Sequence, residues 1–168
     1  MRGIFARMTP FIVLVGSLLL FRALGALVTP FFRSWVTSLR WALAVMFLLT
    51  ASAHFGARRP DLVRMVPRSF PAPELIVTLT GVAEILGAAG LLFPRLAPWA
   101  ASGLALLLVA MFPANVHAAR AGLSIGDAPV TPLVPRAVLQ VMFLAAALVA
   151  GFGASRCLNV PRASADST

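Results

Sequence analysis

A carboxyl group lies in the middle of a long apolar run of this sequence. Glu84 is the eleventh of the twenty residues from 74 to 93, and it is the one ionisable side chain away from the ends of that run. Twenty helical residues are about 30 Å long, which is the thickness of a bilayer's hydrocarbon core. A charge at that depth costs roughly 2.5–3.5 kcal/mol on insertion scales. Glu84 is therefore expected to be protonated, paired or beside a polar cavity, either as a structural hydrogen-bonding group between helices or as a functional group.

Five other polar side chains lie near the ends of neighbouring apolar runs. They are two imidazoles, two carboxamides and a guanidinium: His54, His117, Asn115, Gln140 and Arg136. Together with Glu84, the two histidines could relay protons, which is a common use of ionisable residues in membranes. A pocket that is polar at one end and apolar at the other could also hold a quinone or another amphiphile. The histidines could be haem or metal ligands, but no C-x-x-C-H motif or other spacing calls for this, so we predict no metal site.

No sequence pattern assigns a catalysed reaction. Neither a Ser-His-acid set, a G-x-S-x-G motif nor a glycine-rich phosphate loop is present. Cys157 is the single cysteine, so an intramolecular disulfide and a C-x-x-C redox pair are both excluded. The catalytic residues are therefore left unassigned, and whether the chain is an enzyme stays open.

The composition indicates an integral membrane protein that holds these residues on helices. Of the 168 residues, 60% are hydrophobic and 11% are charged, whereas soluble domains average about 45–50% and 25%. Five apolar runs are expected to form spanning helices, and they cover residues 9–32, 39–55, 74–93, 99–119 and 136–154. The chain is too short for a separate soluble domain in addition, so we expect one helical bundle.

The formal charge of +9 comes with arginine as the only strongly basic residue type. These arginines are scattered between the apolar runs and form no basic face, so we predict no nucleic-acid partner. Their positions at the ends of runs suit anchoring at the surface of a lipid bilayer. Residues 33–40 are expected to be a short polar connection, and residues 56–73, with four arginines and four prolines, a loop with a short interfacial segment.

Five alternating helices bring the polar residues to one half of the membrane. The second and fourth helices end at the face where the third and fifth begin, so the polar residues around positions 54, 115, 117, 136 and 140 share that half. Glu84 lies ~15 Å inside the same face. This predicts a polar pocket that is open to one side and has Glu84 near its floor. That face carries eight arginines against five at the other, which favours a cytoplasmic N-terminus.

Arg22 is a second ionisable residue inside an apolar run. It lies about thirteen residues along the first helix from the same face, at a depth close to that of Glu84. A buried Arg22–Glu84 ion pair would relieve two membrane charges at once. In the alternative arrangement, the long side chain of Arg22 extends to the membrane surface.

A series of short pieces follows in order along residues 40–140. They are A-S-A-His54-Phe55, M-V-P, F-P-x-P, T-Gly81-V-A-Glu84-I-L-G, G-L-L-F-P-R, F-P-A-Asn115-V-His117-A, and P-Arg136 followed by Gln140. With these pieces, residues 40–140 resemble the DoxX family of small bacterial membrane proteins. No single piece is specific, and it is the ordered set over about 100 residues that carries the resemblance.

The resemblance implies a DoxX-like four-helix transmembrane bundle at residues 36–155. It is preceded by an extra N-terminal transmembrane helix within residues 1–35 and followed by a polar tail at residues 156–168. The resemblance further implies an accessory or quinone-associated subunit of a redox system in the bacterial cytoplasmic (inner) membrane, with other membrane redox subunits as partners. The alternative is a proton-coupled small-molecule carrier or a non-catalytic membrane scaffold.

Overall fold

The computed structural model describes residues 8–126 and 128–153. Five long helices carry the fold: α2 (Thr9–Leu27), α3 (Trp35–Phe55), α5 (Pro73–Leu92), α6 (Ala97–Arg120) and α7 (Leu133–Phe152). The shorter elements are the 3₁₀ helix η1 (Pro30–Arg33), the helix α4 (Arg59–Met65) and a two-stranded hairpin of β1 (Ser124–Ile125) and β2 (Ala128–Pro129). Arg2, Arg7, Cys157 and the predicted tail at residues 156–168 lie outside the described residues.

The chain is all-α apart from the small hairpin, as predicted, and all five long helices are long and apolar enough to span a membrane. Their outward faces carry large apolar side chains. Five of these leucines are each 58–70% exposed: Leu19, Leu20, Leu79, Leu86 and Leu106. A soluble protein rarely exposes so continuous an apolar surface, whereas a bilayer solvates it. We therefore treat the chain as a multi-pass membrane protein.

Two predicted boundaries are wrong around the first connection. The first helix ends at Leu27, because Thr29 precedes Pro30 and is extended, with φ −139° and ψ 133°. The predicted polar connection at residues 33–40 is mostly helix, since Ser34 caps the N-terminus of α3 and accepts a hydrogen bond from the Thr37 amide at 3.4 Å. As a result Arg40 lies inside α3 and is buried.

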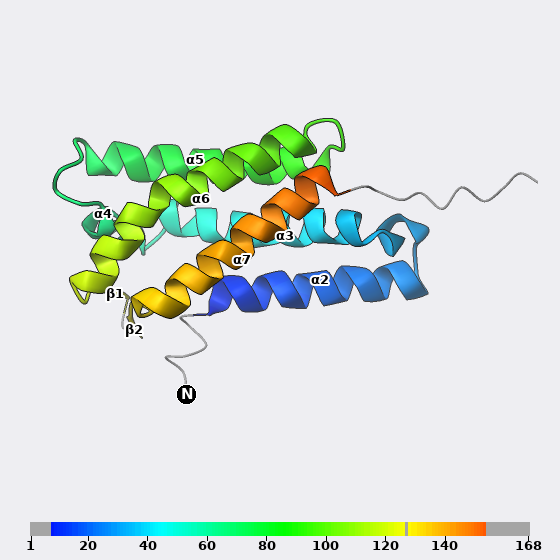
Figure 1. Cartoon of the computed structure of the whole chain (residues 1–168), viewed down its shortest axis with the longest axis horizontal. Helices are drawn as coiled ribbons and strands as arrows, with labels where there is room; N and C mark the ends of the chain where they lie inside the picture. Colours follow the sequence, from blue (N-terminus) through cyan, green and yellow to red (C-terminus); the bar gives the residue numbers. More distant parts are fainter. Residues whose placement is uncertain (1–7, 127, 154–168) are drawn as a thin grey trace, which may run out of the picture.

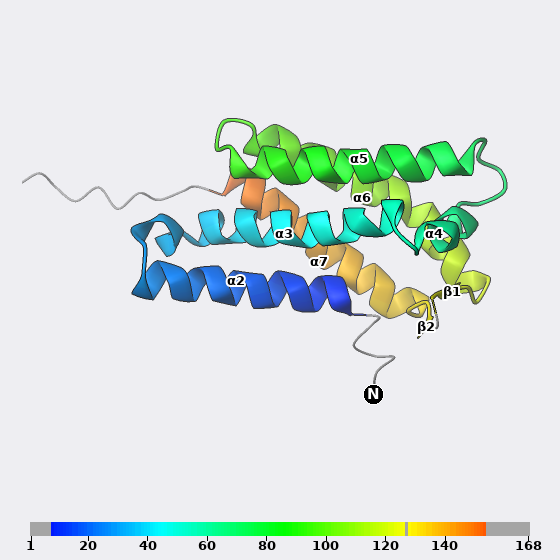
Figure 2. The same ribbon diagram turned by 180° about the vertical axis from the view of Figure 1, so that it is seen from behind.

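Helix α3 is at the centre of the bundle. In Figures 1 and 2, α2 and α5 flank α3 on opposite sides, while α7 crosses α3 diagonally and pairs with α6, which also packs against α5. Nine residues of α3 are buried, compared with three in α7. Because α3 touches three of the other four long helices, side chains on its successive faces point to different neighbours.

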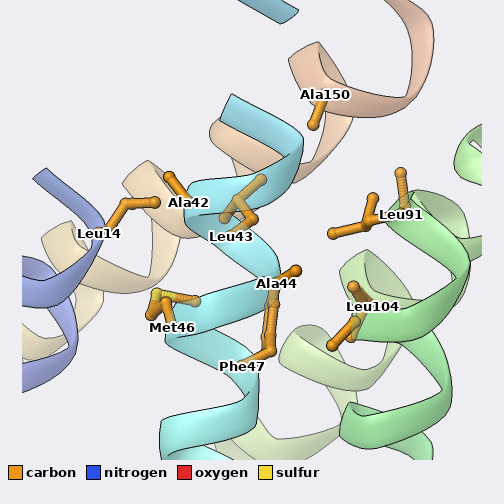
Figure 3. Close-up of a cluster of buried hydrophobic side chains, with 11 residues drawn as sticks. Leu14, Ala42, Leu43, Ala44, Met46, Phe47, Leu91, Leu104 and Ala150 are labelled. Atoms are coloured by element: carbon orange, nitrogen blue, oxygen red, sulfur yellow. The ribbon is translucent and has the colours of Figure 1, made fainter. Parts of the chain in front are cut away.

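The apolar core surrounds the middle of α3. Figure 3 shows Phe47 of α3 close to Leu104 of α6, and Met46 on the side of α3 that faces Leu14 of α2. Leu91 of α5 closes the cluster on a further side. This core occupies the middle of the bundle, so the polar groups gather toward its ends.

Helices α3 and α5 approach each other closely at Gly81. A Cβ atom added there would lie 2.6 Å from the Cβ of His54 and 2.9 Å from Cε2 of Phe55. The ring of Phe55 could rotate away, but the Cβ of His54 is fixed to the backbone, so that contact requires a helix to move. Glycine at this position therefore allows the end of α3 to lie directly against α5, as small residues do in membrane bundles.

The replacement Gly81→Ala tests this contact. The added methyl group is expected to lower the free energy of unfolding by about 1–3 kcal/mol, since it overpacks the α3–α5 contact. The measurement is a denaturant titration in mixed detergent micelles. The matched control is Gly103→Ala on α6, where an added Cβ meets nothing within 4 Å. Equal stabilities of the two variants would contradict the close packing of α3 on α5.

Candidate functional site

The predicted gathering of polar residues occurs at the end of the bundle where α3 and α6 end and α2, α5 and α7 begin. Helix α4 and the hairpin lie at the same end (Figure 1). A cavity of about 660 Å³ opens here, between the start of α2, the end of α3, α4, the hairpin and the start of α7. Its size is in the range of small-molecule sites. The polar residues of its wall include Thr50, His54, Asn115 and Arg136, and its apolar residues include Leu49, Leu62, Met65 and Ile125.

His54 is buried in the last turn of α3 and is held by α5. Its Nδ1 lies 2.8 Å from the carbonyl oxygen of Val77 and 3.2 Å from Oγ1 of Thr80. Because a carbonyl only accepts, Nδ1 carries a proton and donates it to Val77. The other ring nitrogen, Nε2, lies 3.8 Å from Oε1 of Glu84. That distance is within ion-pair range and longer than a hydrogen bond.

Glu84 is also buried, with 4% of its surface exposed. Its Oε2 accepts a hydrogen bond from Oγ1 of Thr50 on α3, at 2.8 Å. The structure thus brings Glu84 together with His54, as the depth argument predicts. Glu84 itself is absent from the wall of the cavity, which Thr50 and His54 form in front of it. The floor of the cavity is therefore Thr50 and His54, and the carboxyl group lies one side chain behind them.

Arg136 and Asn115 form a second polar contact in the wall. The guanidinium of Arg136 donates to Oδ1 of Asn115, which joins α7 to α6. The Nε atom of Arg136 is buried and has no hydrogen-bond partner within the described part of the chain. Gln140 lies one turn further along α7, and its side-chain amide donates to the carbonyl oxygen of Leu108 in α6. Gln140 is not among the residues that line the cavity.

His117 does not join the predicted cluster. It lines a separate cavity of about 670 Å³ with Arg64, Arg68 and Phe70. The reason is helical geometry, because side chains two positions apart, such as those of Asn115 and His117, point to different faces of a helix. A proton relay through His54, Glu84 and His117 is therefore not assembled.

The predicted ion pair between Arg22 and Glu84 is not formed. Arg22 instead donates to the carbonyl oxygens of Phe32, at 3.1 Å, and Arg33, and its guanidinium lies 4.3 Å from the ring centre of Trp35. Since α2 ends only five residues later, the long side chain reaches the polar connection at the opposite end of the bundle. Glu84 consequently has no guanidinium partner among the described residues.

Two arginines with structural roles escaped the sequence reasoning. Nε of Arg40 donates to the carbonyl oxygen of Ala150 at 2.7 Å, in the last turn of α7. Arg59 donates to the carbonyl oxygen of His54 at 3.0 Å and to Oγ1 of Thr78 at 2.9 Å, so it ties the end of α3 to the start of α5. The last carbonyls of a helix lack intrahelical donors, which is why arginine is effective at these positions.

The cavity wall offers hydrogen-bond donors rather than metal ligands. Within residues 8–126 and 128–153, no group of three or more His, Cys, Asp and Glu side chains could hold a metal ion. The side-chain amide of Asn115 and the guanidinium of Arg136 could bind the oxygen atoms of a ligand, whereas the single hydroxyl proton of Thr50 is donated to Glu84 or to the Phe47 carbonyl. The apolar residues of the cavity wall would surround a ring or a hydrocarbon chain.

Fold and cavity together define a class: a multi-pass membrane protein with a polar cavity at one end of a five-helix bundle. Residues 43–151, which are more than half of the chain's 168, match the family model described as "Domain of unknown function (DUF8561)", and the chain belongs to that family. The matched residues run from α3 to α7 and contain Thr50, His54, Asn115 and Arg136 of the cavity wall, whereas α2, which contributes Thr9, lies outside them. No curated protein and no solved structure matched the sequence.

One wall of the cavity depends on Asp61 of α4, which allows a test by pH. Oδ2 of Asp61 accepts a hydrogen bond from the backbone amide of Gly126 in the hairpin, at 2.6 Å, and Oδ1 pairs with Arg64. The Gly126 amide, followed by Arg64, lowers the pKa of the Asp61 carboxyl below its ordinary value. A carboxyl whose pKa is lower in the folded state stabilises the fold above its unfolded pKa, and this contribution is lost as the pH falls through the folded pKa.

The variant Asp61→Asn is therefore expected to melt at a lower temperature than the wild type near pH 7. The difference should begin to shrink as the pH falls below about 4, where the unfolded carboxyl takes up a proton, and should be lost below the lowered pKa of the folded carboxyl, where the wild type is protonated as well. Thermal unfolding in detergent between pH 7 and pH 3 measures both trends. A difference that is independent of pH would show that the charge of Asp61 does not hold the hairpin against α4.

Proposed function

We propose that this chain is a DoxX-like protein of the bacterial cytoplasmic membrane that binds a quinone-like amphiphile as an accessory subunit of a membrane redox system. The observation that carries the proposal is the cavity with Thr50 and His54 at its floor and Glu84 behind them. The quinone itself is suggested by the resemblance of residues 40–140 to the DoxX family.

The residues of the cavity suit the head of a quinone. A quinone carries two carbonyl oxygens, which only accept hydrogen bonds, and the side chains of Asn115 and Arg136 supply donors. Leu49, Met65 and Ile125 provide apolar contacts for the ring and its tail. When bound, such a group would supply the capacity to carry two electrons and two protons.

The contact between Thr50 and Glu84 can accommodate a proton in either position. The Thr50 hydroxyl can donate to an ionised Glu84 carboxylate. It also lies 3.0 Å from the carbonyl oxygen of Phe47, so it can donate there and accept from a protonated Glu84 instead. Both protonation states of Glu84 therefore keep a hydrogen-bond partner, which suits a residue that lies behind His54 and exchanges protons with a ligand in the cavity.

The proposed orientation of the bundle in the membrane rests on the distribution of the arginines between its two ends. With the N-terminus in the cytoplasm, the cavity opens toward the cytoplasmic side, where α4 and the hairpin lie with Arg58, Arg59, Arg64 and Arg68. Soluble electron donors and protons reach a quinone site from that side directly. Membrane subunits that complete the redox system would contact the apolar outer faces of the helices.

Quinone binding tests the proposal directly. The full chain is purified in a mild detergent, and its affinity for the short-chain quinone decylubiquinone is measured by equilibrium dialysis. Asn115→Leu removes a side-chain amide donor from the cavity and should weaken binding by about 5-fold, as expected for a hydrogen bond worth ~1 kcal/mol. The control is Ser102→Ala, an exposed hydroxyl on α6 that bonds within its own helix. The proposal fails if the wild type binds no quinone, or if all three proteins bind it equally.

A proton-coupled carrier is the second candidate, and the burial of Glu84 beside His54 favours it specifically. In a carrier of this kind, the carboxyl group of Glu84 takes up and releases a proton as the substrate crosses the membrane. Proteoliposomes with an alkaline interior are offered a mixture of carbon-13-labelled metabolites, and mass spectrometry identifies those taken up. Glu84→Gln keeps the shape of the side chain and should abolish coupled uptake. Uptake that persists in this variant, or that ignores the pH gradient, would contradict the carrier function.

A further inference from the structure

Among the described residues, the charged side chains that line the cavity are both positive. Arg58 and Arg136 line it, and none of the described lining residues is an Asp or a Glu. Two described acidic side chains at this end of the bundle have other partners, since Asp61 binds Arg64 and the Gly126 amide while Glu84 lies behind Thr50. A cation in a partly buried wall is costly unless a counter-charge balances it.

Arg136 differs from the other buried or half-buried arginines in the groups that accept hydrogen bonds from its guanidinium. Arg22, Arg40 and Arg59 each donate to backbone carbonyl oxygens at helix ends or in connections. Arg136 lies in the first turns of α7, where the helix offers free amides and no free carbonyls. Its hydrogen bond goes to the neutral amide of Asn115, and its Nε is buried without a partner.

We propose that the Arg136–Asn115 end of this cavity is an anion subsite, which binds the carboxylate or phosphate head group of an amphiphile whose hydrocarbon chain lies along the apolar wall. A planar guanidinium suits both head groups, since it binds two oxygens at once. The chain of such a ligand would contact Leu49, Leu62, Met65 and Ile125, which line the same cavity. Arg58 adds positive potential at the mouth.

This proposal rests on the cavity being a ligand site, as the proposed function does, and it adds the charge of the ligand. A neutral quinone accepts hydrogen bonds from Arg136 but does not balance its charge. The two ideas therefore predict different ligands for the same protein. Measuring a neutral quinone and an anionic amphiphile on the same preparations separates their outcomes.

The test compares ligands with the same ten-carbon chain and different heads. The full chain in a nonionic detergent is dialysed against decanoate, decyl phosphate or the neutral decanol, with inorganic phosphate as the head group alone. Decanoate or decyl phosphate should bind at least about 10-fold more tightly than decanol, since a charge-assisted hydrogen bond replaces a neutral one. The stronger of the two anions identifies the head group.

Two variants remove the subsite in different ways. Arg136→Gln should reduce the affinity for the anion to that for decanol. Asn115→Asp supplies a carboxylate beside Arg136 within the protein, so it should weaken anion binding about 10-fold without lowering the melting temperature. This second variant keeps the test valid if Arg136→Gln fails to fold. The control is Arg95→Gln, an exposed arginine in the connection between α5 and α6 at the other end of the bundle.

Selective anion binding that is lost in Asn115→Asp and kept in Arg95→Gln supports the subsite. Equal affinity for decanoate, decyl phosphate and decanol would overturn it, as would anion binding that Asn115→Asp leaves unchanged. If inorganic phosphate binds as tightly as decyl phosphate, the ligand is not an amphiphile, because its hydrocarbon chain would then contribute nothing to the affinity. If the protein binds decylubiquinone but neither anion, the anion subsite alone is overturned. If it binds an anion but no decylubiquinone, only the proposed quinone ligand is overturned.

Discussion

The contact between α3 and α5 is the interaction on which the rest of this structure depends. In a bilayer the hydrophobic effect does not drive helices together, so close packing and interhelical hydrogen bonds must do so. Gly81 lets α5 lie directly against His54, and this approach places the Val77 carbonyl and the Glu84 carboxyl within reach of α3. The same contact that holds the bundle together therefore assembles its buried polar pair.

The buried and half-buried arginines among the described residues divide into two groups by what they bind. Arg40 and Arg59 use backbone carbonyls at the ends of α7 and α3, so their charges serve to join helices. Arg22 does the same at the end of the bundle opposite the cavity, where Phe21, Phe32 and Trp41 pack their rings together. Within the described residues Arg136 has only the neutral amide of Asn115 as its partner, and the proposed anion subsite rests on this contrast.

The two ends of the bundle are consequently unlike each other. One end is filled by aromatic rings and the side chain of Arg22, whereas the other is hollow and is covered by α4 and the hairpin. A membrane protein built in this way offers its interior to one side of the bilayer. The buried carboxyl of Glu84 lies inside the hollow half, where it accepts a hydrogen bond from Thr50 and lies 3.8 Å from Nε2 of His54.

The sequence by itself determined the length, the depth and the alternating direction of the helices. Apolar runs and prolines set where each helix lies along the membrane normal, and this placed Glu84 and His54 in the same half of the bilayer. Tertiary structure alone decided which way each side chain points around its helix, because that rotation depends on how neighbouring helices pack. It turned His117 away from Asn115, sent Arg22 to the far end instead of toward Glu84, and buried Arg40 in a helix where a polar connection was predicted. Periodicity in a helix that is apolar on every side carries little information about rotation, whereas a close contact such as that at Gly81 fixes it.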